Sequence, residues 1–167
     1  AVWVTAAIAI PGVGKAQEAT EVGSPRTRNI QIGGRVIDGP PPPLAPETIT
    51  RDASGGATVR AVRLDGPWQL DGVLDEPVYS GVQPFGDFIQ QAPDEGAPAS
   101  ERIEAWILYD DEAIYVAARL WESVPESEWV ANEMQRDSFQ LINNDGFIAV
   151  FDTFYDRRNG FAFRVNP

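Results

Sequence analysis

The stretch Ile103-Glu-Ala-Trp-Ile-Leu-Tyr109-Asp-Asp-Glu-Ala-Ile114-Tyr-Val-Ala-Ala-Arg-Leu120 predicts the fold of this chain more clearly than any other segment. It contains two runs in which side chains alternate with a period of two residues, and this alternation is typical of β-strands. An acidic turn, Asp110-Asp-Glu112, separates the runs and makes the pair a predicted β-hairpin. Large apolar side chains occur at both alternating sets of positions. We therefore expect both faces to be covered, as in a β-sandwich.

A second hairpin is predicted near the end of the chain. Phe147–Phe151 is almost wholly apolar, and Gly160–Val165 is its expected partner. Phe85–Gln91 predicts one more strand, whereas helices are expected only over residues 76–81 and 127–134. The fold class is therefore all-β, an antiparallel β-sandwich. Because the chain stops directly after a predicted strand, we expect the sandwich to be truncated at its C-terminus.

Composition divides the chain into three regions. Residues 1–19 are an apolar run followed by small residues, which is typical of the end of a secretory signal peptide. The alternative for Ala1–Ile10 is a buried strand or helix. Residues 20–60 contain the run Pro40–Pro43 and predict an exposed, proline-rich linker. Residues 61–167 form the predicted sandwich. We therefore expect an exported protein, in the periplasm, the outer membrane or the extracellular space.

The charge and the missing residue types exclude several functions. The chain has 13 Lys+Arg against 25 Asp+Glu, with no cysteine and no histidine. Residues 61–167 hold seven basic and twenty acidic side chains, hence a net charge of −13. Such a chain has no basic surface for nucleic acid. It also lacks thiolate nucleophiles, the histidine of a catalytic triad, and thiolate or imidazole metal ligands. A metal would need oxygen ligands, as calcium does.

The candidate binding residues are tryptophans, carboxylates and amides. Trp68 and Trp129 lie in irregular, polar surroundings and are candidate platforms for a pyranose ring, although half-buried packing is the alternative. Asp137 and Asn144 are candidates for bonding the sugar hydroxyls. Oxygen ligands are densest in a set of six residues, Asp137, Asn143, Asn144, Asp145, Asp152 and Asp156. Within it, Asp145, Asp152 and Asp156 are candidate ligands for a structural Ca²⁺, and ordinary turn formation is the alternative.

Three ordered stretches carry a family resemblance. They are Leu70-Asp-Gly-Val-Leu-Asp-Glu-Pro77, the hairpin from Glu104 to Leu120, and a third stretch from Arg136-Asp137 through Asn144-Asp-Gly-Phe147 to Pro167. Together they resemble the family 9 carbohydrate-binding modules. The closest likeness is to the variant at the N-terminus of exported bacterial proteins that continue as an outer-membrane-type β-barrel. The resemblance covers about residues 62–167. It implies a β-sandwich that binds polysaccharide or oligosaccharide, often holds calcium, and serves polysaccharide breakdown.

The sequence also departs from the family pattern. Val78-Tyr79 stands where the family usually has a tryptophan, and Asp145-Gly146 stands where many relatives have two acids. Asp145 and Asp152 match the acidic positions of the family. The later half of the family, which supplies one side of its aromatic sugar clamp, lies outside this sequence. The leading hypothesis is a non-catalytic carbohydrate-binding module.

Two alternatives stay open. The first is a structural or interaction domain, without sugar binding, tethered to an outer-membrane β-barrel in the same chain. The second is part of a glycoside hydrolase (O-glycosyl hydrolase), which would need a pair of carboxylates about 5–10 Å apart. Acidic residues are so numerous that the sequence singles out no such pair.

Overall fold

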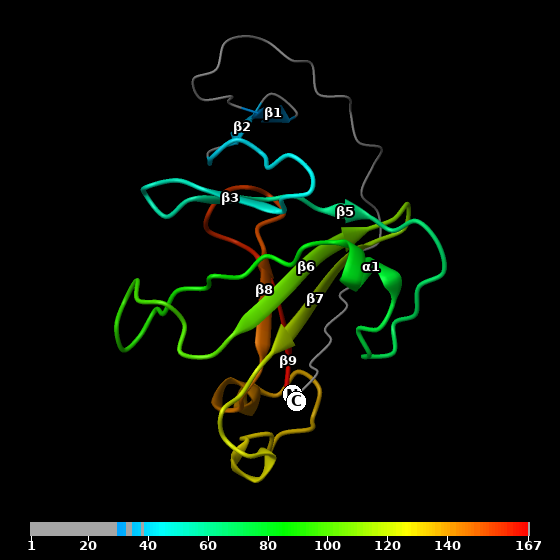
Figure 1. Cartoon of the computed structure of the whole chain (residues 1–167). Helices are drawn as coiled ribbons and strands as arrows, with labels where there is room; N and C mark the ends of the chain where they lie inside the picture. The colour runs from blue at the N-terminus through cyan, green and yellow to red at the C-terminus, as the bar shows by residue number, and fades with distance from the viewer. Residues whose placement is uncertain (1–29, 33–34, 38, 167) are drawn as a thin grey trace.

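The computed structural model describes residues 30–32, 35–37 and 39–166, and the statements below concern these residues (Figure 1). Most of the regular structure is β-strand. The strands are β1 (Ile30–Ile32), β2 (Arg35–Ile37), β3 (Ile49–Arg51), β4 (Ala57–Val59), β5 (Val62–Arg63), β6 (Ile103–Tyr109), β7 (Ile114–Leu120), β8 (Phe147–Phe151) and β9 (Phe161–Val165). Helical structure is limited to α1 (Pro77–Gly81) and two 3₁₀ segments, η1 (Glu126–Glu128) and η2 (Phe139–Asn143). The predicted β-rich character is confirmed. No described helix has the length and apolar composition needed to cross a bilayer.

The largest sheet contains β5, β6 and β7 in that order. β6 and β7 pair antiparallel from Ile103↔Leu120 to Tyr109↔Ile114, which confirms the hairpin predicted from the alternating sequence. β5 joins the other edge of β6 in parallel, with Val62 opposite Leu108. The hairpin forms locally because a short acidic turn connects two strands of equal length. β5 reaches the sheet only through long-range folding.

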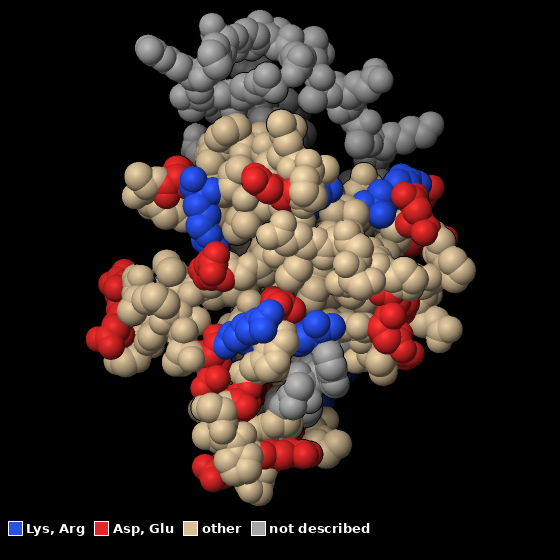
Figure 2. Space-filling model, viewed as in Figure 1, with Lys and Arg blue, Asp and Glu red and all other residues tan. Residues whose placement is uncertain are grey.

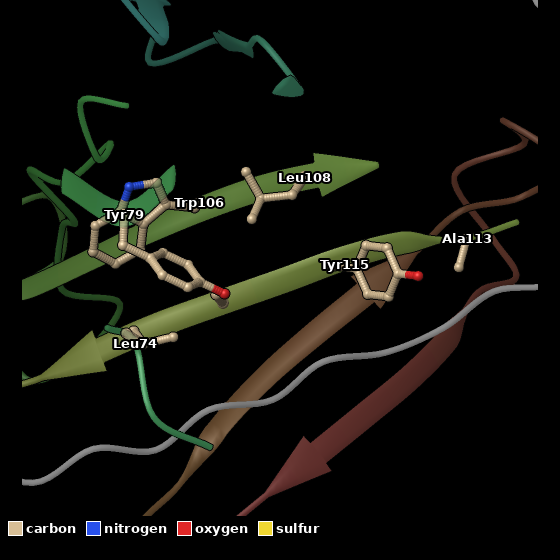
Figure 3. Close-up of a cluster of buried hydrophobic side chains, with 7 residues drawn as sticks. Leu74, Tyr79, Trp106, Leu108, Ala113 and Tyr115 are labelled. Carbon is tan, nitrogen blue, oxygen red and sulfur yellow. The ribbon is translucent and has the colours of Figure 1, made fainter. Parts of the chain in front are cut away.

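The main core lies on one face of this sheet (Figure 3). Trp106 and Leu108 from β6 pack with Tyr115 from β7, and Leu108 is fully buried. The short helix α1 covers them. Its Tyr79 meets Trp106 edge to face, with ring centroids 5.4 Å apart, and the indole N–H of Trp106 donates to the carbonyl of Val82 just after the helix. Apolar burial and a satisfied indole N–H therefore hold α1 on the sheet.

The opposite face of the sheet is also buried. Ala105, Val116 and Ala118 point to that side and are at most 5% exposed. The expectation that both faces of the hairpin are covered is therefore confirmed. In Figure 1 the second predicted hairpin, β8 with β9, crosses behind β6 and β7. Its strands pair antiparallel from Phe147↔Val165 to Phe151↔Phe161, as the sequence predicted.

Residues 127–134 do not form the predicted helix. Only the 3₁₀ segment η1 forms there. Trp129, directly after it, is extended, and residues 130–134 have no regular structure. The reason is a set of long-range hydrogen bonds: the N–H of Val130 donates to Oδ2 of Asp145 at 2.8 Å, and the N–H of Asn132 donates to Oδ1 of Asn144 at 2.7 Å. These donors are thereby removed from any helical ladder.

Two other segments also differ from the local prediction. Phe85–Gln91 makes only isolated bridges, Phe85↔Ala105 and Ile89↔Pro98, because Asp87 between them adopts a left-handed φ of 56°. The predicted linker, residues 20–60, contains an antiparallel pair, β3 with β4, in its described part. One of its prolines, Pro40, is buried, and its carbonyl accepts a hydrogen bond from the hydroxyl of Thr58.

Candidate functional site

The candidate site is a hollow of about 470 Å³ beside the start of β6. Its lining comes from two segments that are separated by residues 89–97, namely Pro84–Phe88 and Pro98–Glu104. Between them the chain forms a ribbon, residues 88–99, held by a bond from the N–H of Ala99 to the carbonyl of Phe88. The ribbon projects to the left in Figure 1, and its charged side chains in Figure 2 are all acidic. The hollow lies where this ribbon leaves the sheet.

Two phenyl rings supply the aromatic part of the lining. Phe85 and Phe88 are both half-buried, and their ring centroids lie 6.0 Å apart at an interplanar angle of 40°. Phe85 is held by two backbone hydrogen bonds with Ala105 of β6, each 2.9 Å long. The guanidinium of Arg51 donates to the carbonyls of Gly86 and Asp87, at 2.8 and 3.1 Å. β3 and β6 therefore position the phenyl wall from two sides.

The opposite wall carries polar and charged groups. Arg102 forms an ion pair with Glu104, and Arg119 of β7 lies 3.5 Å from the same carboxylate. Arg102 also stacks on the ring of Trp121, 4.4 Å from its centroid. Glu101 accepts a 2.6 Å hydrogen bond from the hydroxyl of Ser123. These contacts preorganise the side chains at one rim of the hollow, and they cover the face of Trp121 with a cation.

The predicted tryptophan platforms lie elsewhere. Trp68 packs against the core, with its ring centroid 4.4 Å from that of Tyr115, and its indole N–H donates to the hydroxyl of Tyr79. Trp129 follows η1 and donates to the carbonyl of Val124 at 3.4 Å. Trp68 therefore has the half-buried packing role that was the alternative. Neither tryptophan lines the hollow.

Asp137 and Asn144, the two residues predicted to bind sugar hydroxyls, lie in different environments. Asp137 is exposed, adopts a left-handed φ of 59°, and lies 3.4 Å from the guanidinium of Arg136. Asn144 is 7% exposed, and both ends of its amide bond backbone groups, the N–H of Asn132 and the carbonyl of Gln140. Its observed role is to tie two loops together. Sugar binding by these two residues stays a prediction.

The predicted calcium ligands are engaged in turns and loop contacts. Asp145 exchanges hydrogen bonds with Val130. Asp152 accepts from the backbone N–H groups of Asp156 and Arg157, and Asp156 in turn accepts from the next residues of its own loop. Within the described ranges, no three acidic side chains gather as a metal site requires. Calcium binding by these three residues stays a prediction.

The residues around the hollow were not among the sequence candidates. The one local signal is the segment Phe85-Gly-Asp-Phe88, in which two aromatic residues flank a turn-forming pair. That signal cannot show that Glu101 and Arg102 lie on the other side of a cavity, because the ribbon between the two segments sets their separation. Comparisons with protein-family models, curated proteins and solved structures find no match for this chain.

Proposed function

We propose that this chain is a non-catalytic carbohydrate-binding β-sandwich module of an exported protein. The observation that supports it best is the hollow beside β6, which combines the rings of Phe85 and Phe88 with carboxylates on its rim. Its volume falls in the range of about 300–1,000 Å³ that is usual for ligand sites. Aromatic rings pack against the apolar face of a pyranose, and carboxylates accept hydrogen bonds from its hydroxyls.

The sandwich arrangement is part of the proposal. Its support is the burial of both faces of the β6–β7 hairpin and the passage of β8–β9 behind it in Figure 1. In this arrangement the hollow lies where β6 begins, at one end of the sheet of β5, β6 and β7 and beside the ribbon of residues 88–99. Loops at the end of a rigid sandwich are common positions for binding residues.

Of the carboxylates at the rim of the hollow, one is fixed by ion pairs and two are available to accept hydrogen bonds from a ligand. Glu104 is held between two arginines, so it orients Arg102 and Arg119. Asp87 is exposed at the turn between the two phenylalanines, and Glu101 is half-buried beside Ser123. We assign Asp87 and Glu101 as the acceptors for sugar hydroxyls. A site whose walls are already positioned loses less entropy when it binds.

The test is affinity electrophoresis and isothermal titration of the 167-residue chain against xylan, cellulose and short oligosaccharides, with and without calcium. We expect retardation by at least one glycan, and about a tenfold loss of affinity in Phe88→Ala, because an aromatic stack contributes on the order of 1.4 kcal/mol. Phe154→Ala is the matched control, since Phe154 is 62% exposed on the loop between β8 and β9. Trp129→Ala tests the sequence-based platform in the same assay. No retardation by any glycan in the presence of calcium would contradict the proposal.

A structural or interaction domain is the second candidate, and β8–β9 favours it. Ile148 and Val150, on one face of this hairpin, are 48% and 64% exposed, although they lie in a strand. Exposed apolar groups in regular structure are typical of a surface that another segment or partner covers. Hydroxyl-radical footprinting of the full-length protein, including any outer-membrane barrel, should then show both side chains protected. Release of reducing ends from the same oligosaccharides would instead favour a hydrolase.

A further inference from the structure

We propose that Asn159 is a site of spontaneous deamidation and that Asp156 slows the reaction. Asn159-Gly160 is the only Asn-Gly pair in the sequence, and it is exposed in the loop between β8 and β9. The carboxylate of Asp156 holds this asparagine twice. Its Oδ1 accepts from the backbone N–H of Asn159, and its Oδ2 accepts from the side-chain amide, each at 2.9 Å.

The co-reactant is water. The backbone nitrogen of Gly160 attacks the side-chain carbonyl carbon of Asn159, a nitrogen–carbon bond forms, and the amide nitrogen leaves as ammonia. The proton lost by the Gly160 nitrogen passes to the solvent, and the leaving nitrogen takes one from it. Water then opens the cyclic imide at either carbonyl, giving aspartate or isoaspartate. Glycine favours the first step because no side chain obstructs its nitrogen and its backbone adopts many conformations.

Asp156 opposes this reaction in the folded protein. Its Oδ1 accepts from the backbone N–H of Asn159, and its Oδ2 accepts from the side-chain amide and so fixes the side chain in one orientation. The side-chain bond must break before the amide can turn its carbonyl carbon toward the nitrogen of Gly160. The negative charge of the same carboxylate also disfavours the anionic intermediate that forms beside it. The folded loop should therefore react more slowly than the unfolded chain.

Deamidation would alter the end of the hairpin. The product places a carboxylate where an amide donor faced Asp156, so that an attractive contact becomes a repulsive one. Isoaspartate also lengthens the backbone by one carbon directly before Gly160. A Cβ on Gly160 would lie only 3.0 Å from the carbonyl oxygen of Phe151, so there is little room for additional atoms here. We expect the Phe151↔Phe161 end of the β8–β9 ladder to open.

The test is peptide mapping by mass spectrometry after incubation of the 167-residue chain at neutral pH. We expect a gain of about one dalton at Asn159 before it appears at exposed Asn143, the internal control, which asparagine follows. The reaction should be faster in urea. Asp156→Ala should accelerate it in the folded protein by about fivefold, the factor for one net hydrogen bond. A circular dichroism spectrum matching the wild type would confirm that the variant folds.

Three results would overturn the proposal. Asn143 could react before Asn159, which would show that the Asn-Gly loop is not the preferred site. Folded and urea-unfolded chains could react at the same rate, which would show that the loop gives no protection. Asp156→Ala could slow the reaction, which would make this carboxylate a base that promotes attack.

Discussion

The hydroxyl of Tyr115 donates a 2.8 Å hydrogen bond to Oδ2 of Asp110, and this bond joins β7 to the turn that precedes it. The other carboxylate oxygen accepts from the backbone N–H groups of Glu112 and Ala113, both at 2.8 Å. The ring of Tyr115 lies in the core against Trp68. One side chain therefore connects the turn of the main hairpin to the apolar face that α1 covers.

Tyr115→Phe should lower the free energy of unfolding by about 1 kcal/mol. The substitution keeps the buried ring and removes only the hydroxyl that Asp110 accepts from, so the expected loss is that of one net hydrogen bond. Urea unfolding followed by tryptophan fluorescence measures it. Tyr109→Phe is the control, because it also removes only a hydroxyl and keeps the ring beneath Arg63. Equal midpoints for Tyr115→Phe and the wild type would contradict the role of this bond.

The stability of the fold should decrease in acid in a way that depends on Asp110. The backbone N–H of Glu112, followed by the hydroxyl of Tyr115, holds the pKa of Asp110 below its usual value. Because the folded-state pKa is below the unfolded one of about 3.9, the carboxylate stabilises the fold above that pH. This contribution is lost as the pH falls through the folded-state pKa. Asp110→Asn should therefore show a flatter decline in urea midpoint between about pH 6 and pH 2. If the urea midpoint of Asp110→Asn fell with pH as steeply as that of the wild type, this carboxylate would be excluded as the cause of the acid sensitivity.

Leu108→Ala should destabilise the fold by about 3 kcal/mol, since it leaves a cavity at a fully buried position of the core. Leu70→Ala, at a position 54% exposed, should change stability by less than about 0.5 kcal/mol. Chemical denaturation of both variants gives the comparison. Similar losses in the two variants would show that the core does not lie on this face of the sheet.

Gly146→Ala should weaken the start of β8 by about 1–3 kcal/mol. A Cβ at Gly146 would overlap the carbonyl oxygen of Val165, the strand partner of Phe147, so the backbone has to move. Gly81→Ala, where no atom lies within 4 Å of the added carbon, is the control. Hydrogen exchange of the β8–β9 amides should increase in the first variant only. Retained protection in Gly146→Ala would contradict the close approach.

Arg51→Ala should weaken glycan binding in the hollow while leaving the core intact. Arg51 bonds the carbonyls of Gly86 and Asp87, so its loss should loosen the turn between the two phenylalanines. We expect faster hydrogen exchange over residues 84–90, several-fold weaker binding, and little change in the urea midpoint. Arg60→Ala, which removes bonds to the carbonyls of Glu47 and Pro46, is the matched control. Faster hydrogen exchange with unchanged glycan affinity would show that this turn does not contribute to the binding site.

Local patterns predicted the two hairpins and α1, since each depends on residues that are close in sequence. β6–β7 has alternating side chains around an acidic turn, and α1 begins at Pro77, whose fixed φ suits the first helical turn. The same reasoning predicted a helix over 127–134, and it was wrong. The deciding bonds come from Asp145 and Asn144, which no local pattern relates to Val130 and Asn132.

Composition and side-chain alternation are enough to predict a β-rich, acidic chain without cysteine or histidine, because neither depends on long-range contacts. Which aromatic residues pack in the core and which line a cavity depends instead on contacts that form when the chain folds. Trp68 occupies the edge of the core because α1 brings Tyr79 to it. Phe85 and Phe88 line the hollow because Arg51 of β3 and Ala105 of β6 hold the turn that carries them. Hydrogen bonds between residues that are not neighbours in the sequence therefore determine which aromatic residues are packed and which line the hollow. The partners in these bonds meet only when the chain folds.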